Sequence, residues 1–488
     1  MDVMTDFDVA IIGAGPTGGV LACLLALRGM KVYLCDKDHA IYPKPRAIAL
    51  DHEIMRTFQQ VGIADQVLPF TEPFTPSEFF GVDGQMIRRM TMVAPPYPQG
   101  YTPSMVFNQP EMERILRGRI ASLPNITFEL GVSLIGLQEH RGGVQLNLSN
   151  GSTLQATWAV GCDGGSSKTR ELLGIELEDL DFDQAWLVVD VLANEKGLAK
   201  LPKTSVQYCE PARPATLVIG PKNHRRWEIA LNADEDLALM QTPAMTWELL
   251  SRWITPDDAA LWRQASYRFH ALVAKQWRST PLGKTGRVFL AGDAAHQQPP
   301  FLGQGMCQGL RDAANLAWKL AAQKDAPNDA LLGTYEAERS AHVRALTARI
   351  KDVGLIVGER DVKRAKARDA KLLAACGGVV PDTPRQDVLP PLSTGCLSSQ
   401  LTSGRGRLFV QPRLQSAAGE SILMDAQLGY GWRWIAPEDL QERDGVIAAW
   451  FKAHNARSAL IRPDHYVFGT ANTDAERDRL QAESQIYR

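Results

Sequence analysis

The N-terminal part of the chain alternates short apolar runs with one glycine-rich turn. Residues 7–12 form an apolar, β-branched run of the kind found in buried parallel strands. Residues 19–28, rich in Leu and Ala, predict a helix that Gly29 ends. Residues 31–35 predict a second strand. We therefore expect a βαβ unit whose first turn is formed by residues 13–18.

The first turn carries three spaced glycines, each with its own structural requirement. Gly13 permits a tight turn, Gly15 lets a pyrophosphate approach the backbone, and Gly18 lets the helix pack against the strand. The free N–H groups at the helix N-terminus attract that pyrophosphate. Asp36 follows the second strand, where a carboxylate can accept hydrogen bonds from ribose hydroxyls. The pattern predicts a dinucleotide site, but it does not separate FAD from NAD.

Two later apolar strands also run into short turns that contain an acid. Residues 158–161 lead to Asp163, and residues 288–291 lead to Asp293. A loop rich in Pro and Gly then precedes a long helical pattern at 307–323. Asp293 could accept a hydrogen bond from a ligand hydroxyl, and the alternative is a helix N-cap.

The region between the second and third turns is predicted to be mostly β. Its candidate strands lie at 185–191, 205–209, 215–219 and 226–231. Side chains on these strands that could line a pocket are Gln207, Tyr208, Arg225, Arg226 and Trp227. Each could equally lie on an ordinary half-solvated face of the sheet.

The C-terminal part of the chain changes character. A charged helical pattern at 363–372 precedes residues 376–403, which are rich in Pro, Gly and Ser and predict a linker. Beyond it, short strands are predicted at 408–411, 432–435 and 465–469.

Composition limits the class of protein. A chain of 488 residues with 45% hydrophobic and 22% charged residues is typical of a globular protein of two or three domains. The formal net charge of −2 gives no reason to expect a nucleic-acid partner. No apolar run approaches the length of a membrane span, and the N-terminus does not resemble a secretion signal. The seven scattered cysteines predict free thiols in a reducing cytoplasm and no metal site.

The three turns, in this order and spacing, resemble those of the group A flavoprotein hydroxylases, which include para-hydroxybenzoate and phenol hydroxylases. Within that family, the chain resembles 3-(3-hydroxyphenyl)propionate hydroxylase-type enzymes. That resemblance rests on residues 42–51, 107–110, 292–309 and 311–320. It implies an α/β protein: an FAD-binding Rossmann-like domain as in para-hydroxybenzoate hydroxylase, a β-sheet substrate domain and a short thioredoxin-like C-terminal domain.

The resemblance also implies a domain organisation. The FAD-binding domain would be discontinuous, assembled from residues 1–75, 100–175 and 285–375. The remaining units would be a substrate-binding sheet at 76–99 and 176–284, a linker at 376–403 and the thioredoxin-like domain at 404–488.

Site residues follow from the motifs and the resemblance together. Arg46 and Gln109 would contact FAD, and Asp293 would hold the ribityl chain. The full set expected to bind the cofactor is Gly13, Gly15, Pro16, Thr17, Gly18, Asp36, Lys37, Arg46, Gln109, Asp163, Gly292, Asp293, Pro300, Gly303, Gly305 and Met306. The set expected to bind substrate is Gln207, Tyr208, Trp227 and Pro299. No residue stands out as the catalytic base, and His52, Tyr208 and His270 are assigned no such role.

The implied activity is that of an FAD-dependent monooxygenase that uses NADH or NADPH and O2. It would hydroxylate a phenolic ring through a flavin C4a-hydroperoxide, with a 3-(3-hydroxyphenyl)propionate-like compound as one candidate. Two alternatives stay open: a hydroxylase or epoxidase of an N-heteroaromatic or polyketide ring, and a non-catalytic FAD-binding sensor or sequestering protein. A hydrolase is disfavoured because no Gly-x-Ser-x-Gly turn occurs. We expect a monomer or a homodimer.

Overall fold

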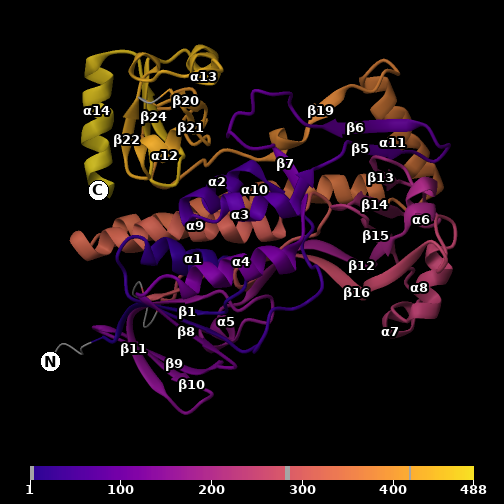
Figure 1. Cartoon of the computed structure of the whole chain (residues 1–488), viewed down its shortest axis with the longest axis horizontal. Coiled ribbons are helices and arrows are strands. Elements are labelled where there is room, and N and C mark those ends of the chain that lie inside the picture. Colours follow the sequence, from indigo (N-terminus) through magenta and orange to yellow (C-terminus); the bar gives the residue numbers. More distant parts are fainter. Residues whose placement is uncertain (1–4, 281–285, 417–418) are drawn as a thin grey trace.

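The computed structural model of the chain describes residues 5–280, 286–416 and 419–488, except for the side chain of Asp325. Two large sheets form the body, and a smaller C-terminal domain lies against its long helices (Figure 1). The first sheet has the order β8-β2-β1-β11-β10-β9, and β17 pairs with β11. Its strands are β1 (Phe7–Ile12), β2 (Val32–Asp36), β8 (Ile126–Leu130), β9 (Leu134–His140), β10 (Gly143–Leu148), β11 (Thr153–Gly161) and β17 (Val288–Leu290).

Strands β8, β2, β1, β11 and β17 are parallel, and apolar side chains cover them on both faces. Helices cover one face, and the antiparallel pair β9–β10 folds against the other. The helices on or near the covered face are α1 (Pro16–Ala26), α2 (His52–Val61), α3 (Ala64–Val67), α4 (Gln109–Ala121) and α9 (Gly305–Asp325). Helix α1 begins three residues before the predicted start, because Pro16 lacks an N–H and suits the first helical position.

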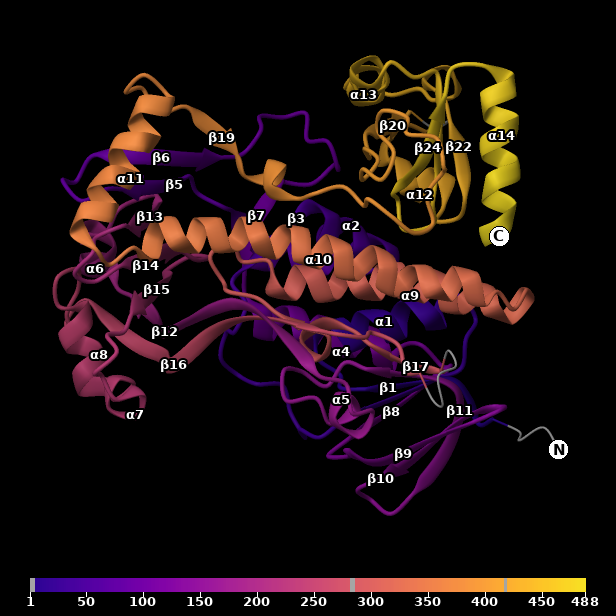
Figure 2. The same cartoon turned by 180° about the vertical axis from the view of Figure 1, so that it is seen from behind.

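The second sheet has nine strands in the order β18-β16-β12-β15-β14-β13-β5-β6-β19. Their bounds are β5 (Ser77–Phe80), β6 (Met86–Thr91), β12 (Leu177–Ala193), β13 (Ser205–Tyr208), β14 (Ala215–Ile219), β15 (His224–Ala230), β16 (Ala259–Ala274), β18 (His296–Gln297) and β19 (Asp382–Pro384). Its outer face packs against α6 (Glu195–Lys200), α7 (Leu237–Met240) and α8 (Pro243–Leu250). The view from behind shows these helices at the end of the molecule away from the first sheet (Figure 2).

The segment predicted as a linker is packed against the body. Residues 382–384 form β19, which pairs in parallel with β6, and Arg89 of β6 contacts Asp382 at 2.8 Å. Further along, Cys396 is fully buried. The Pro and Gly content of 376–403 therefore reflects an irregular path along the surface of the body. In the sequence, this segment comes after α10 (Asp329–Gly358) and α11 (Val362–Ala375).

The C-terminal domain contains a three-stranded antiparallel sheet, β22-β23-β24, and a two-stranded hairpin. Its elements are β20 (Arg413–Gln415), β21 (Ser421–Leu423), α12 (Met424–Leu428), β22 (Arg433–Ile435), α13 (Val446–His454), β23 (Ser458–Ile461), β24 (Val467–Ala471) and α14 (Asp474–Ser484). The strand predicted at 408–411 is wrong: only Leu408 makes an isolated bridge, to Tyr466. The mixed α/β class is confirmed.

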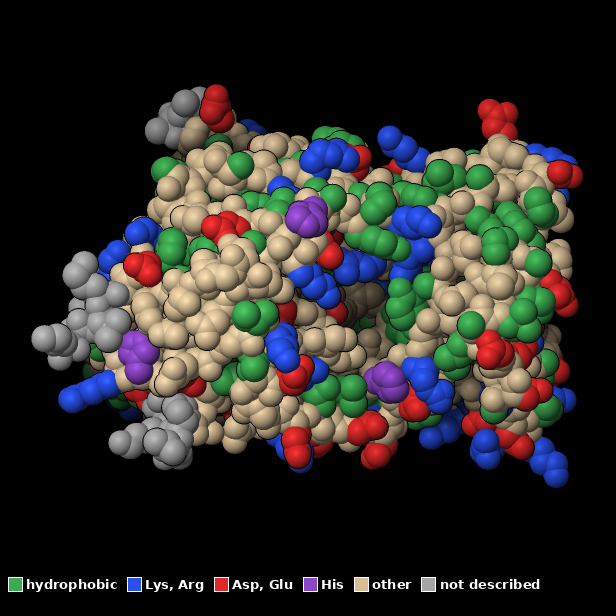
Figure 3. All heavy atoms as spheres, turned by 90° about the horizontal axis from the view of Figure 1, so that it is seen from below, with side chains coloured by type: hydrophobic (Ala, Val, Ile, Leu, Met, Phe, Trp, Pro, Cys, Tyr) green, Lys and Arg blue, Asp and Glu red, His purple; other side chains and the backbone are tan. Residues whose placement is uncertain are grey.

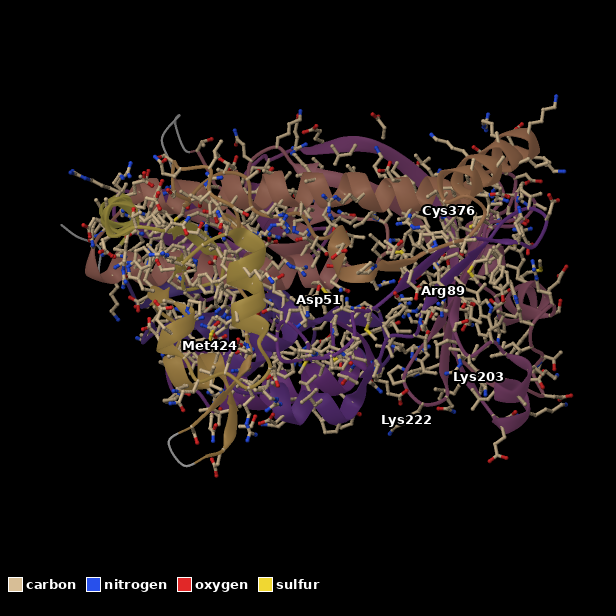
Figure 4. The ribbon with its side chains drawn as sticks, turned by 90° about the horizontal axis from the view of Figure 1, so that it is seen from above. Asp51, Arg89, Lys203, Lys222, Cys376 and Met424 are labelled. Carbon is tan, nitrogen blue, oxygen red and sulfur yellow. The ribbon has the colours of Figure 1, made fainter. Side chains whose placement is uncertain are left out.

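Buried ion pairs attach the C-terminal domain to the body. Arg56 of α2 binds Asp425 at 2.6 Å, and Arg462 binds Glu338 of α10 at 2.7 Å, with all four side chains fully buried. Figure 4 shows Asp51 midway along the molecule, between Met424 of the C-terminal domain and Arg89 of the second sheet. Asp51 belongs to a separate short sheet with the order β3-β7-β4. Its strands are β3 (Ala49–Asp51), β4 (Thr71–Pro73) and β7 (Ser104–Phe107).

All seven cysteines are free thiols. Among the described residues, every helix is too short or too polar to cross a bilayer.

Candidate active site

The three predicted turns meet at one edge of the first sheet. Strands β1, β11 and β17 are neighbours and run parallel, so their carboxyl ends lie side by side. The backbone joins the turns directly: Cys162 N donates to Ile12 O at 2.7 Å, and Ala291 N donates to Gly161 O at 2.9 Å. Ligands of open parallel sheets bind at this edge. Figure 3 shows a hollow between the domains of the two sheets, with Lys and Arg side chains beside it.

The glycine turn has the geometry that its three glycines require. Gly13 has a φ of +100°, and a Cβ there would lie 2.4 Å from Cys162 O. A Cβ at Gly18 would lie 1.9 Å from Gly13 O, whereas a Cβ at Gly15 would meet nothing within 4 Å. The backbone is therefore tightly packed at the two outer glycines and open at the middle one. The open position, at the N-terminus of α1, is where an anionic group can approach.

Asp36 is oriented by the same turn. Its Oδ2 accepts a hydrogen bond from Ala14 N at 2.7 Å, and its Oδ1 accepts one from Asp38 N at 2.9 Å. The carboxylate is thereby fixed at the end of β2, beside the glycine turn. Lys37, the next residue, is exposed.

Thr17 connects the glycine turn to α9. A Cβ on Gly292 would lie 2.8 Å from Thr17 Oγ1, and a Cβ on Gly309 would lie 2.3 Å from it. The hydroxyl of Thr17 thus fills a space that only glycines at both positions leave open. The contact fixes α1 against α9 and against the third turn.

The third turn presents a carboxylate without a protein partner. Gly292 N donates to Asp312 Oδ2 at 2.9 Å, and His296 Nε2 lies 2.7 Å from the same oxygen. Asp293 itself makes no hydrogen bond with a described residue and caps no helix. Its side chain is accessible to solvent, yet protein atoms surround it closely enough that desolvation raises its pKa. Asp293 is therefore held ready for a ligand hydroxyl, and His296 has a structural role.

Gln109 positions the segment that carries Arg46. Its Oε1 accepts from Arg46 N at 3.0 Å and Ala47 N at 2.5 Å, and its Nε2 donates to Glu113 at 2.6 Å. The amide of Gln109 thus holds the backbone of Arg46 in place, and its contact with FAD stays a prediction. The exposed guanidinium of Arg46 lies over the ring of Tyr42 at 5.7 Å and has no carboxylate partner among the described residues.

Asp163 also serves its own turn. Its Oδ2 accepts from Thr169 N at 2.9 Å and from Thr169 Oγ1 at 3.0 Å, and its Oδ1 accepts from Ser167 Oγ at 2.5 Å. These bonds fix the start of α5 (Lys168–Leu172). The Asp163 side chain thus shapes the turn, and its contact with the cofactor stays a prediction.

The proline-rich loop leads into the N-terminus of α9. Gly303 N donates to Pro300 O at 2.6 Å, and the φ of Gly303 is +65°. A Cβ at Gly305 would meet nothing within 4 Å, and no side chain caps α9. The first N–H groups of α9, at Gly305 and Met306, are therefore free to face a ligand with partial negative charge.

Two of the predicted substrate residues lie on the wrong face of the second sheet. Tyr208 packs against Trp253 with ring centroids 5.3 Å apart, and Trp227 packs against the same ring at 6.0 Å. Both belong to the outer face covered by α6, α7 and α8. Strand residues alternate between faces, so Gln207 and Arg226 point inward instead.

The inner face carries a polar row that includes one residue absent from the prediction. Gln207, Thr216 and Glu228 are paired across β13, β14 and β15, and Thr216 Oγ1 donates to Gln207 Oε1 at 2.6 Å. Glu228 is only 4% exposed and makes no hydrogen bond with a described residue. The signal in the sequence is a single acid within the apolar run that ends β15.

A half-buried cation lies near this face. Arg385, in the segment predicted as a linker, donates to Leu302 O at 2.9 Å and stands 4.1 Å from the ring centroid of Phe74. It has no carboxylate within 4.0 Å among the described residues, and burial lowers its pKa to about 10. Pro299, the remaining predicted substrate residue, is buried in the loop that also holds Leu302.

Comparisons with known proteins agree with this geometry. Residues 6–350 match the model of the FAD binding domain, and residues 436–485 match that of the HcaD C-terminal domain. A probable NADH-specific resorcinol 4-hydroxylase of Rhodococcus jostii (strain RHA1) is 36% identical over 96% of this chain and 93% of its own length. A 3-(3-hydroxy-phenyl)propionate/3-hydroxycinnamic acid hydroxylase of Mycobacterium sp. (strain JLS) is 32% identical over 95% of this chain and 89% of its own.

The chain belongs to the FAD-dependent aromatic hydroxylases. Two solved structures share its fold. A complex of aklavinone-11 hydroxylase with FAD and aklavinone has a TM-score of 0.78 at 21% identity, covering 100% of this chain and 99% of that one. The flavin-dependent monooxygenase PieE, with FAD and substrate, has a TM-score of 0.80 at 19% identity, covering 99% and 100%. The predicted family and fold class are confirmed.

The residues of this hydroxylase fit FAD. An elongated ligand with a pyrophosphate, a polyol and a ring needs an anion site, a hydroxyl acceptor and hydrogen-bond donors for the ring. The open backbone at Gly15, the unpartnered carboxylate of Asp293 and the uncapped start of α9 at Gly305 supply these three groups.

Neither of the two histidines considered as a base lies on the inner face of the second sheet. His52 is buried at the start of α2, where desolvation lowers its pKa to about 4. His270 of β16 pairs with Asp183 of β12, and the side chain that packs inward is that of its neighbour Phe269.

Proposed function

We propose that this protein is an NADH-dependent hydroxylase of a phenolic ring, with FAD as its cofactor and O2 as co-substrate. The observation that carries the proposal is the convergence of three turns on one sheet edge, where Asp293 makes no hydrogen bond with any described residue. The names of the similar proteins, which include resorcinol and 3-(3-hydroxy-phenyl)propionate hydroxylases, support the phenolic substrate.

Each part of the site has a defined task in this reaction. When bound, FAD supplies the redox chemistry that takes hydride from NADH and transfers one oxygen atom of O2 to the ring. The N-terminus of α1 would bind the pyrophosphate, and Asp293 would accept a ribityl hydroxyl. The free N–H groups at the start of α9 would donate hydrogen bonds to the cofactor ring and so favour negative charge on it. Pro299 and Pro300 stiffen the loop that keeps water away from the reacting atoms.

The half-buried Arg385 supports a substrate that carries negative charge. A partly desolvated guanidinium with no carboxylate within 4.0 Å among the described residues is stabilised when an anion joins it. A hydroxyphenyl acid would bring a carboxylate, whereas resorcinol would not. We therefore propose the hydroxyphenyl acids as the preferred class.

A substrate panel tests the reaction. Resorcinol, simple phenols and hydroxyphenyl acids are mixed with the FAD-loaded protein, and stimulated NADH oxidation is measured together with the mass of the product. We expect a gain of one oxygen atom, fastest with a hydroxyphenyl acid. Rapid H2O2 formation with no oxygenated product from any phenol would contradict the proposed reaction.

The variant Asp293→Ala tests the cofactor site. Loss of the unpartnered carboxylate removes the acceptor for the ribityl chain, so the purified variant should lose most of its flavin absorbance. Asp234→Ala, at an exposed acid remote from the turns, is the matched control and should keep its flavin. Full flavin content in Asp293→Ala would contradict the assignment of the site.

We also propose a cytoplasmic protein that is a monomer or a homodimer. The seven unpaired thiols support the reducing compartment.

A further inference from the structure

Glu228 lies between the two segments that flank the cofactor site. On one side along β15, Arg226 donates to Arg46 O at 2.8 Å and to Pro45 O at 3.3 Å. On the other side, Ala230 packs in the cluster that contains Phe301 and Leu302 of the proline-rich loop. Alternate residues of a strand are about 7 Å apart, so the backbone of Glu228 lies about 7 Å from that of Arg226 and of Ala230. Its side chain is therefore on the inner face of the second sheet, the face that makes both of these contacts.

Glu228 is buried among groups that do not neutralise it. Arg226 is engaged with Asp190, whose Oδ1 and Oδ2 accept from Nε at 2.7 Å and Nη2 at 3.1 Å. His224 and Arg263 also contact Asp190, so the charges beside Glu228 on β12 and β15 are already paired.

Apart from Arg46, the remaining groups around Glu228 are neutral. Thr216 on β14 and Gln207 on β13 are neutral and bond to each other. Tyr267 of β16 lies near Arg226, and Arg46 is the cation on the opposite segment. Phe301 and Leu302 present only apolar surface. A buried acid without a hydrogen-bond partner is expensive unless it serves a ligand.

Near neutral pH, both the protonated and the ionised form of Glu228 are populated. Desolvation raises its pKa to about 7, with Arg226 lowering it and Asp190 raising it. A general base works best when its pKa is close to the working pH. Clefts in which burial shifts a carboxyl in this way are candidates for catalysis.

We propose that Glu228 is the catalytic residue that takes the proton from the phenolic hydroxyl of the substrate. The inference rests on the proposed function and names a base for it. The O–H bond of the phenol breaks, its proton passes to a carboxylate oxygen of Glu228, and the electron pair stays on the phenolate. The phenolate ring is then rich enough in electrons to accept oxygen. Glu228 later releases the proton to solvent.

The variant Glu228→Gln tests this role in the FAD-loaded protein. Gln has the shape of protonated Glu, so the variant should keep its flavin and its substrate-stimulated NADH oxidation. Product formation near pH 7 should fall about a hundredfold, which is the usual contribution of a general base. The rise of wild-type product formation with pH, centred near the pKa of Glu228, should move in the variant toward the higher pKa of the free phenol.

Fluorinated phenols provide a second readout, because they ionise without help. They should restore much of the product formation of Glu228→Gln, which loss of folding would not allow. Glu248→Gln, on the exposed side of α8, is the matched control and should keep the wild-type pH profile. Wild-type product formation and pH profile in Glu228→Gln would overturn the inference while leaving the proposed function intact. A wild-type protein that holds FAD but oxygenates no phenol would overturn both.

Discussion

Thr17 shows how one hydroxyl sets the separation of two helices. Its Oγ1 occupies the space that Gly292 and Gly309 leave open. Replacing Gly309 with Ala should lower the free energy of unfolding by about 1–3 kcal/mol, because the new methyl group overlaps the hydroxyl. The measurement is the urea unfolding midpoint, followed by flavin content.

Two further variants separate overlap from helix propensity. Gly333→Ala in α10 adds a methyl group that meets nothing within 4 Å, and should stabilise the protein by about 0.5–1 kcal/mol. In a Thr17→Ala background, Gly309→Ala should cost less than it does alone. An equal cost in both backgrounds would show that the hydroxyl does not limit the approach of α9.

The burial of Glu228 has a consequence for stability as well as for catalysis. Its pKa rises from 4.5 in the unfolded chain to about 7 in the folded protein. Because folding raises the pKa of this carboxyl, its contribution to the free energy of unfolding is full below pH 4.5. That contribution is lost as the pH rises to about 7. The wild-type protein should therefore lose about 1.4 kcal/mol per pH unit across this window relative to Glu228→Gln. Urea titrations of both proteins from about pH 5 to about pH 8 measure this difference, and a constant difference would contradict it.

At the scale of elements, the sequence predicts what depends on neighbours along the chain. The glycine turn was predictable because each glycine is required by a strand or helix that lies within a few residues of it. Strands β1 and β2 and helix α9 were predictable from short-range hydrophobic patterns. The faces of the second sheet were not predictable. Alternation places Tyr208 and Gln207 on opposite faces, but only packing against α8 decides which face is the outer one.

Other parts of the site escaped prediction because their partners are remote in sequence. Gln109 and Asp163 were predicted to bind FAD, and the sequence did not reveal that their side chains also hold backbone of the surrounding turns. Arg385 lay in a segment whose Pro content predicted a linker, and its contact with Leu302 spans 83 positions. Glu228 belongs to no motif, so only the three-dimensional surroundings distinguish it from any other strand acid.

At the scale of the whole molecule, buried charges join the C-terminal domain to the long helices. Arg462 donates to Glu338 of α10, to Asp464 and to Cys396 O, all within 3.0 Å. Arg462→Met would leave the buried Asp464 without its cation and Glu338 with Lys319 alone, so the free energy of unfolding should fall by about 3–5 kcal/mol.

Denaturation by urea measures this loss. Arg457→Met, at an exposed arginine of the same domain, is the control and should change the free energy of unfolding by less than about 0.5 kcal/mol. A midpoint for Arg462→Met equal to that of Arg457→Met would show that the domain is held by other contacts.

The nine-stranded sheet ends in very short strands on both sides. At one edge β18 has 2 residues, and at the other β19 has 3. Long exposed edges are templates on which another chain can add a strand, and proteins limit this hazard by shortening them. Because segments from elsewhere in the chain close both edges, the sheet offers little backbone for intermolecular pairing. Its architecture thus favours resistance to aggregation at high protein concentration.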